Sequence, residues 1–414
     1  MMILVIGVVI GYLLLVFAFC LPTGRIRNNV VESASSFNGE YHYLIHDNIM
    51  TKTDDFTDAI MLMTASDTGD GNPFTEAIYA YHTEREDAGP NEVIRDLNSS
   101  ENYQVTYSRY WHGYLLLLKP LLIFFNYSQI QVLISFIVIA LVIIVAYLLQ
   151  KKGLTKYIIP YSIAIAMMFP MTISLSLQYI SVFGIFNVFM IVILLYFDRL
   201  FERKNYFYLF LIIGMLTCYF DFLTYPVVTL GIPLLIWLLL LNKKEKKSNV
   251  YNLKQVLIGM AAWCIGYFGI WVGKWSIGSL VTGRNLFSSA MDAANSRASV
   301  TMFSEEITRF FPISEVFNKI FSEPFLLIIF MLIIIFMVMM ARKKIVLKKQ
   351  RVFANLWMLV IAIIPLLWFM ILANHSAWHL FFTYRTMSVL IFAIGCYIMS
   401  IIGKNDNSRG KKDG

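Results

Sequence analysis

Long apolar runs recur along the chain, and short polar segments separate most of them. A run of about 20 apolar residues forms a helix long enough to cross the ~30 Å hydrocarbon core of a bilayer. The pattern therefore predicts an all-α polytopic membrane protein with about ten transmembrane helices. These are residues 2–20, 129–149, 157–176, 182–198, 206–220, 226–241, 255–274, 324–341, 354–373 and 385–402.

One long polar segment, residues 21–127, separates the first apolar run from all the others. Within it, apolar residues at helical spacing predict a helix over residues 55–68, with Asp54 or Thr53 as its N-cap. Residues 111–125 are apolar but too short to span a bilayer, so they predict an interfacial or re-entrant helix. The segment therefore predicts a large outer loop that contains short and membrane-parallel helices.

The composition agrees with a membrane protein. Hydrophobic residues make up 58% of the 414 residues and charged residues 14%, whereas soluble domains carry roughly a quarter charged residues. We predict four parts: a first transmembrane helix at 1–20, an outer loop at 21–127, a multi-span domain at 128–402 with a second outer loop at 275–324, and a basic tail at 403–414.

The net charge of +8 indicates topology rather than a nucleic-acid partner. The positive-inside rule assigns basic connections to the cytosol, which predicts that both termini lie in the cytosol; Arg25 and Arg27 mildly oppose this orientation. All six histidines then fall on the outer face, which indicates that this face carries the function. The basic connections are residues 150–156, 198–205, 242–255, 342–351 and the tail from 403.

Three aspartates, Asp54, Asp55 and Asp58, begin the helix predicted in the first outer loop. In a helix, Asp54 and Asp58 share a face, whereas Asp55 points about 100° away. A carboxylate beside a membrane-embedded pocket can act as a general base on an acceptor hydroxyl, or can hold a divalent metal. The alternative is that these residues only cap and solvate a helix N-terminus, which favours negative charge.

A second cluster near the C-terminus contains His375, His379, Tyr384 and Arg385. The two histidines are four residues apart and can face one site, with Arg385 behind them. Arginine binds phosphate oxygens through its planar fork. This spacing also suits zinc, but no glutamate follows the first histidine in a metalloprotease pattern. The alternative is an interfacial belt of Trp, His, Tyr and Arg side chains.

Single polar residues at the outer ends of predicted spans are further candidates. Lys274 lies between Trp271 and Trp275, where it either meets a lipid phosphate or extends harmlessly to the interface. Asp221 lies in a tight outer turn, and a charge at such depth is functional or a turn cap. Gln178, in another predicted outer turn, can line the same cavity as Asp221.

The layout resembles the C-type (GT-C) membrane glycosyltransferases, which include protein O-mannosyltransferases, the aminoarabinose transferase of lipid A and oligosaccharyltransferases. They share one anchor helix, a large acidic outer loop that ends in a membrane-parallel helix, and many further spans. The stretches 54–62, 273–275 and 375–385 are similar to those of bacterial relatives from surface-polysaccharide clusters. The chain lacks the Asp-Glu pair of O-mannosyltransferases and a C-terminal soluble domain, so protein glycosylation is not favoured.

The resemblance implies an inverting transferase. Its substrates are a polyprenyl-phosphate-linked sugar and a cell-surface glycan or lipid-linked acceptor on the extracytoplasmic face. Asp54 becomes the first candidate for the catalytic base, with Asp55 or Asp58 as alternatives, while Lys274, Arg385 and His379 hold the donor's phosphate. Membrane lipid surrounds the protein, no nucleotide or nucleic acid takes part, and a divalent metal is the one cofactor left open.

Two rival functions remain. One is a polysaccharide polymerase or ligase acting on undecaprenyl-pyrophosphate glycans, which relies on arginines of a large outer loop such as Arg284, Arg297 and Arg309. The other is a flippase or transporter, for which buried mid-membrane charges and paired discontinuous helices are expected. The chain places its ionisable groups at the outer ends of the spans, which disfavours transport.

Overall fold

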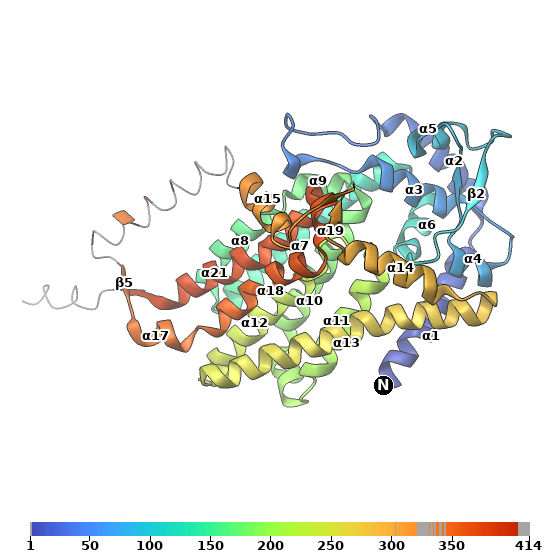
Figure 1. The fold of residues 1–414 in the computed structure, drawn as a ribbon. Helices are drawn as coiled ribbons and strands as arrows, with labels where there is room; N and C mark the ends of the chain where they lie inside the picture. The colour runs from blue at the N-terminus through green and yellow to red at the C-terminus, as the bar shows by residue number, and fades with distance from the viewer. Residues whose placement is uncertain are drawn as a thin grey trace, which may run out of the picture.

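The computed structural model describes residues 2–302, 304–320 and 345–404, with single positions between 331 and 342. Helices dominate these residues, and strands are few and short (Figure 1). Most of the predicted span at 324–341, residues 343–344 of the basic connection at 342–351, and residues 405–414 of the tail lie outside the described residues. The remaining predicted spans all fall on helices.

Five helices in the described residues are long and apolar enough to cross a membrane. They are α1 (Met2–Phe19), α7 (Tyr127–Lys151), α10 (Leu177–Glu202), α13 (Asn249–Thr282) and the continuous segment Leu380–Ile401, which joins α20 (Leu380–Thr383), η5 (Tyr384–Met387) and α21 (Ser388–Ile401). Shorter apolar helices among the described residues are α6 (Leu115–Phe124), α11 (Tyr206–Phe220) and α18 (Trp357–Ile371). Two further helices, α8 (Ile158–Met167) and α12 (Val228–Lys244), lie in predicted spans. The prediction of an all-α membrane-type fold is confirmed at this level, while the number of ten spans stays a prediction.

The predicted span at 157–176 is wrong as a single helix. It consists of α8 and the short α9 (Pro170–Leu175), and a further break at Ser176 precedes α10. Phe169 has a left-handed backbone with φ 53°. Proline disfavours the helical conformation in the residue before it, so Pro170 ends α8. Gln178, predicted in a turn, instead lies in the first turn of α10.

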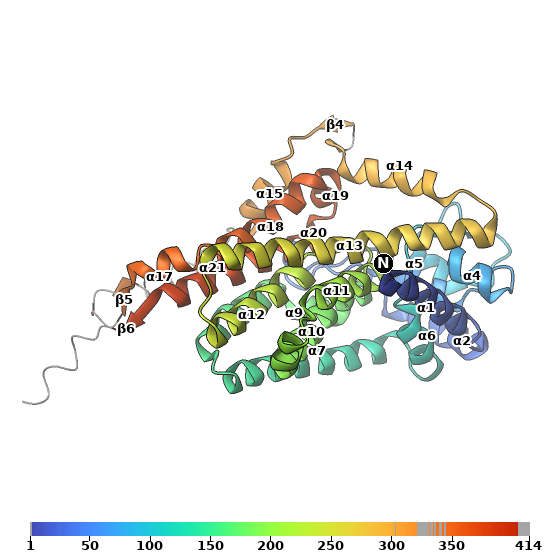
Figure 2. The same cartoon turned by 90° about the horizontal axis from the view of Figure 1, so that it is seen from below.

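The centre of the bundle is a close pair of helices, α11 and α13. A Cβ atom on Gly214 would collide with the backbone carbonyl of Trp263, and one on Gly266 would collide with that of Leu211. Small residues of this kind let two membrane helices approach closely. In Figures 1 and 2, α13 runs along the molecule with α12 near its N-terminal half and α4 (Pro73–Tyr79) near its C-terminal half.

The predicted basic connections meet one another at one end of the bundle. Lys243 Nζ donates to the Lys152 carbonyl at 2.5 Å, and Lys244 pairs with Asp198 at 2.7 Å. Lys156 Nζ donates to the Met399 carbonyl at 2.8 Å. These contacts agree with the prediction that the connections lie on a single side. Nearby, the antiparallel strands β5 (Ile345–Leu347) and β6 (Ile402–Lys404) pair beside α17 (Lys349–Ala354).

The segment between α1 and α7 gathers at the other end (Figure 1). It folds into short helices and a small two-stranded antiparallel sheet, joined by irregular segments. Its elements are α2 (Thr23–Glu32), η1 (Ser33–Ser36), η2 (Ile49–Thr51), α3 (Asp55–Ser66), α4, β1 (His82–Glu84), α5 (Pro90–Val93), η3 (Ile94–Asp96), β2 (Tyr103–Val105) and α6.

The second outer segment covers part of the bundle beside α13 and α18. Figure 2 shows α14 lying along the outside of α13. The elements are α14 (Leu286–Ala298), β3 (Thr301–Met302), β4 (Glu305–Glu306), α15 (Phe311–Ile320) and, after α18, α19 (Ala373–Trp378).

Candidate active site

Asp54 is the N-cap of α3, as the sequence predicts. Its Oδ1 accepts from the Thr57 backbone N–H at 3.0 Å, and its Oδ2 accepts from the Thr57 hydroxyl at 2.9 Å. Oδ2 also accepts from the side-chain amide of Gln178. These bonds fix the carboxylate at the junction of α3 and α10, and they leave Oδ1 with a single partner among the described residues.

Asp58, one helical turn after Asp54, accepts hydrogen bonds from groups on α7 and α10. Its Oδ2 accepts from Leu177 N at 2.8 Å and from the Tyr127 hydroxyl at 2.7 Å, and Oδ1 accepts from Gln178 N at 3.4 Å. The carboxyl therefore caps α10, because the side chain of the N-cap residue Ser176 makes no capping bond. Asp58 is fully buried, and burial raises its pKa well above the ordinary range.

Asp55 faces the polar loop that precedes α3. Its Oδ2 lies 3.2 Å from His42 Nδ1 and accepts from Asn38 N at 3.2 Å, while Oδ1 accepts from the Thr53 hydroxyl at 3.3 Å. Burial raises the pKa of Asp55, and the neighbouring His42 opposes that rise. Asp55 therefore ties the loop to the start of α3. Among the described residues, each of the three carboxylates has two partners on Oδ2 and one on Oδ1, so the aspartates differ in the identity of their partners rather than in their number.

Lys52 supplies a positive charge beside Asp54. Its Nζ lies 4.0 Å from the centroid of the Tyr41 ring and 4.3 Å from that of Phe381, a cation–π arrangement. Within the described part of the chain, this ammonium donates no hydrogen bond and has no carboxylate within 4.0 Å. Burial raises the pKa of Asp54, and the Lys52 charge opposes that rise. The pair combines a base with a cation whose donors are free.

The two histidines meet as predicted, with ring centroids 4.8 Å apart. His375 Nε2 contacts the Leu223 carbonyl at 2.8 Å, while the ring of His379 stacks on Phe382 at 5.0 Å. Burial, followed by the positive charges of Arg297 and Lys52, lowers the pKa of His379 to about 4. His379 is therefore neutral near pH 7 and contributes a polar aromatic wall rather than a charge.

Arg385 and Tyr384 point into the helix break rather than toward the histidines. Arg385 is fully buried; its guanidinium donates to the Met168 carbonyl at 2.9 Å, to the Phe381 carbonyl at 3.1 Å and to the Thr172 hydroxyl at 2.5 Å. The Tyr384 hydroxyl lies 3.3 Å from the same Met168 carbonyl and 3.0 Å from that of Met50. A break in a membrane helix leaves buried carbonyls without helical donors. These two side chains supply donors there.

Lys274 is buried at a different place, against α4. Its Nζ donates to the carbonyls of Ala77 and Ile78 at 2.9 and 3.0 Å, and it lies 5.5 Å from the Trp111 ring centroid. These carbonyls belong to the last turn of α4, where cations are favourable. Lys274 therefore joins α13 to α4, and no contact among the described residues brings it to Arg385 or His379.

Asp221 shapes the predicted tight turn between α11 and α12. It accepts from Thr224 N at 3.0 Å and also from the Thr224 hydroxyl, and burial raises its pKa to about 7. In this turn Leu223 has a left-handed backbone with φ 68°. The turn presents the Leu223 carbonyl to His375 on one side and the Leu223 side chain to a pocket on the other.

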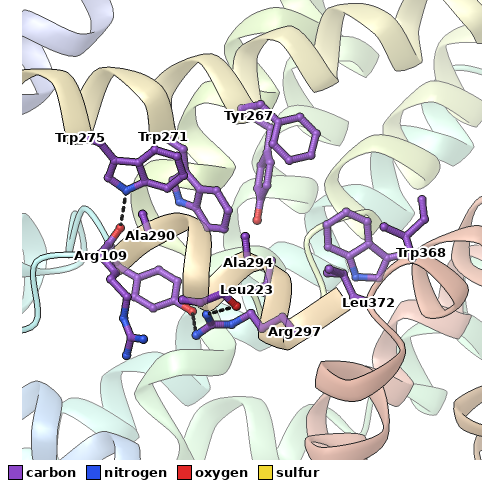
Figure 3. A pocket seen from close by; sticks show the side chains of 14 residues that line it. Arg109, Leu223, Tyr267, Trp271, Trp275, Ala290, Ala294, Arg297, Trp368 and Leu372 are labelled. Atoms are coloured by element: carbon purple, nitrogen blue, oxygen red, sulfur yellow. Dashed lines mark hydrogen bonds between the residues drawn. The ribbon is translucent and has the colours of Figure 1, made fainter. Parts of the chain in front are cut away.

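That pocket, here the α13–α14 pocket, has a volume of about 140 Å³ (Figure 3). Its walls are mainly aromatic, and Phe268 and Ile371 in its lining are 49% and 59% exposed, which places them at its mouth. An apolar mouth beside membrane-type helices suits a hydrocarbon chain. The aromatic lining comprises Tyr110, Tyr267, Phe268, Trp271, Trp275 and Trp368.

Polar groups in the α13–α14 pocket are mostly unpaired donors. Arg297 donates to the Tyr110 hydroxyl at 2.8 Å and to the Ala293 carbonyl at 3.2 Å, and no carboxylate of the described residues lies within 4.0 Å of it. The Tyr267 hydroxyl points into the pocket (Figure 3) and makes no hydrogen bond with described residues. The buried indole nitrogens of Trp271 and Trp368 also lack partners there. The pocket is therefore mainly apolar, with the Arg297 guanidinium and the Tyr267 hydroxyl among its few polar groups.

His379 relates the α13–α14 pocket to Lys52. The positive charges of Arg297, which lines the pocket, and of Lys52 both contribute to the lowered pKa of His379. The His379 ring lies 6.2 Å from that of Phe381, which in turn covers the Lys52 ammonium. His379 is therefore within electrostatic reach of both cations.

Sequence reasoning missed Lys52 and named Arg297 only for a rival function. No spacing rule reveals Lys52, because its aromatic partners are Tyr41 and Phe381, which lie far apart in the sequence. Comparison of the chain with protein-family models, curated proteins and solved structures gives no match. Among the described residues, no group of three or more His, Cys, Asp or Glu side chains has an arrangement that holds a metal ion.

Proposed function

We propose that this protein is a membrane glycosyltransferase. It transfers a sugar from a polyprenyl-phosphate donor to a cell-surface glycan or lipid-linked acceptor on the extracytoplasmic face of a bacterial plasma membrane. One observation carries the proposal: Arg297, which lines an apolar pocket and has no carboxylate partner among the described residues, and Lys52 beside Asp54 both act on His379 through their charges. That combination matches an amphiphile with a phosphate at its polar end.

The donor enters from the bilayer side of the α13–α14 pocket. Its hydrocarbon chain lies along Phe268 and Ile371, and its phosphate meets Arg297, whose planar fork suits phosphate oxygens. Lys274 and Arg385, which the resemblance assigns to the phosphate, already donate to backbone carbonyls and a hydroxyl. Arg297 and Lys52 retain free donors, so the proposal assigns the phosphate to them.

Asp54 acts as the general base. Its raised pKa makes it a better proton acceptor than an exposed carboxylate, and Thr57 and Gln178 hold it in place. The acceptor hydroxyl loses its proton to Asp54 as its oxygen bonds to the anomeric carbon. The bond from that carbon to the phosphate oxygen breaks, and polyprenyl phosphate leaves with inversion. Lys52 and Arg297 stabilise the charge that develops on the phosphate.

The test is the surface-glycan composition of cells that carry Asp54→Asn, with Asp55→Asn and Asp58→Asn as matched controls and membrane levels measured by blot. We expect Asp54→Asn to reach the membrane at normal levels and to lose a single sugar substituent. Wild-type glycan from all three variants contradicts the proposal.

A polymerase or ligase of pyrophosphate-linked glycans is the second candidate. It is favoured by Arg297, the outer-loop arginine that lines the α13–α14 pocket. Arg284 lies over Tyr79, and Arg309 bonds the carbonyls of Ala298 and Met370. Loss of glycan chain length with unchanged composition in the Asp54→Asn cells supports this candidate instead.

A flippase is less favoured. The break between α8 and α10 is a feature expected of one, but the buried Arg385 beside it donates to protein groups rather than facing an open site.

A further inference from the structure

A second pocket lies on the other side of α3, in the first outer segment. It is here called the α3–β1 pocket, and its volume is about 400 Å³. Its floor is apolar and comes from Phe56 and Ile60 of α3. Its rim is polar and comes from β1 and the turn that follows. The carboxylates in the lining are Glu40, Glu84, Glu86 and Asp87.

The lining of the α3–β1 pocket accepts hydrogen bonds far more than it donates them. Its four carboxylates are acceptors when ionised. Arg85, the one cation among its lining residues, pairs with Asp96 at 3.7 Å. Glu40, Glu84, Glu86 and Asp87 are all exposed, so their charges face whatever enters. Like-charge repulsion disfavours an anionic ligand here.

His82 adds a buried acceptor to the same lining. The residue is 5% exposed, and its Nε2 lies 3.1 Å from Glu84 Oε1. A carboxylate accepts only, so Nε2 carries the proton of the bond. Burial lowers the pKa of His82, which keeps the ring neutral and makes Nδ1 an acceptor. Within the described residues Nδ1 has no partner, and a buried acceptor without a donor is costly.

The α3–β1 pocket adjoins the candidate active site through two stacked rings. Phe56, in its floor, stacks on Tyr41 with ring centroids 6.3 Å apart and an interplanar angle of 14°. Tyr41 in turn covers the Lys52 ammonium at 4.0 Å. A molecule seated against Phe56 therefore lies next to the residues that flank Asp54.

We propose that the α3–β1 pocket binds the acceptor glycan and selects a hydroxyl-rich sugar unit with a free, protonated amine. The role of the bound glycan as acceptor rests on the proposed transferase function, whereas the binding chemistry follows from the residues that line the pocket. Hydroxyl and ammonium groups donate to the carboxylates of the rim, and the apolar face of a sugar ring covers Phe56 and Ile60. The α13–α14 pocket, with its unpaired donors, has the opposite preference, so the two substrates are separated by charge.

The experiment measures the binding of monosaccharide probes to the purified full-length protein in lipid nanodiscs, by ligand-observed NMR titration at pH 7. The probes are methyl glucosaminide, its N-acetyl derivative, methyl glucoside and methyl glucuronide. A charge-assisted hydrogen bond exceeds a neutral one by enough to predict about tenfold tighter binding of the amine probe than of the N-acetyl probe. Added salt weakens this preference, because exposed charges are screened.

Two substitutions on the exposed rim test the carboxylates without disturbing the core. We expect the double variant Glu86→Gln and Asp87→Asn to reduce amine binding by about tenfold and to leave methyl glucoside binding unchanged. Glu101→Gln is the matched control, because Glu101 is also an exposed acid of this segment but does not line the pocket.

Equal binding of the amine, N-acetyl and glucuronide probes overturns the proposal, and so does the absence of saturable amine binding. Displacement of the amine probe by micromolar Ca²⁺ also overturns it and makes the rim a cation site. Asp54→Asn protein keeps amine binding if the two pockets act as proposed. If the amine probe binds but no sugar transfer depends on Asp54, the transferase proposal is refuted and the sugar-binding proposal stands. If transfer depends on Asp54 but the pocket does not prefer the amine probe, the sugar-binding proposal is refuted and the transferase proposal stands.

Discussion

Replacing Asp54 with asparagine separates its chemical role from its structural one. As the N-cap of α3, Asp54 accepts from Thr57 N at 3.0 Å, and asparagine retains that acceptor oxygen. Asparagine and aspartate are nearly equal as N-caps. The new amide faces the Thr57 hydroxyl, which can accept a bond as well as donate one, and the side chain of Gln178, whose amide can rotate. The free energy of unfolding should therefore change by no more than about 0.5 kcal/mol.

The same substitution removes the proton acceptor, because an amide is not a base at neutral pH. Loss of a general base costs about 10²–10⁴-fold in rate. Asp58→Ala is the contrasting variant. It leaves the buried Leu177 N–H without a partner and removes the cap of α10, which costs about 2–4 kcal/mol of folding free energy.

The assay measures sugar transfer from a synthetic polyprenyl-phosphate donor by purified protein, together with thermal unfolding in detergent. Asp54→Asn should unfold at the wild-type temperature and lose transfer, while Asp58→Ala should unfold earlier. Wild-type transfer by Asp54→Asn refutes the assignment of the base. A fall in its unfolding temperature as large as that of Asp58→Ala shows instead that the carboxylate is structural.

Four further outcomes follow from the contacts of other side chains. Lys52→Met should lower kcat by about 10–10²-fold without lowering the unfolding temperature, because its ammonium makes no hydrogen bond with the described residues and methionine preserves the aromatic packing. An unchanged kcat excludes Lys52 from the reaction. Arg297→Gln should raise the donor KM by about tenfold, whereas Arg284→Gln, its exposed neighbour on the same outer segment, should behave as wild type; equal effects in both contradict a pocket role. Lys274→Met should lower the unfolding temperature through the loss of two hydrogen bonds worth about 1 kcal/mol each. An unchanged unfolding temperature together with a raised donor KM indicates instead that Lys274 binds the donor phosphate. Burial raises the pKa of Glu76 from 4.5 to about 7, so the stability that its protonated form contributes is complete below pH 4.5 and is lost as the pH rises through 7. The unfolding temperature of Glu76→Gln should therefore decline less steeply between pH 4 and 8 than that of the wild type. Identical profiles refute the pKa shift.

The sequence alone determined the helices and their polarity. Residues 206–220 were predicted as a span and form α11 with the same limits, because apolar runs of that length bury themselves as helices. The N-cap role of Asp54 was equally readable, since capping depends only on the next three residues. The tight turn at Asp221 follows for the same reason. These features depend on local chemistry.

The roles of the long charged side chains were decided only by tertiary structure. Lys274 finds its partners 196 and 197 residues away, and Arg385 finds Met168 and Thr172 more than 200 residues away. A flexible side chain at the end of a span meets a phosphate or a buried carbonyl according to what the fold brings within reach. Likewise, Arg385 stabilises the helix break around Pro170 by donating a hydrogen bond to the buried Met168 carbonyl.

The candidate site shows the same division. The sequence indicated Asp54 as a candidate base, but it did not distinguish Asp54 from Asp55 and Asp58, which are also aspartates at the start of α3. The tertiary contacts separate them: Asp58 caps α10, Asp55 binds His42, and Asp54 faces the aromatic enclosure of Lys52. Hydropathy and spacing are properties of neighbouring residues, whereas a pocket is formed by side chains from distant segments, so its lining and charge arise only when the chain folds.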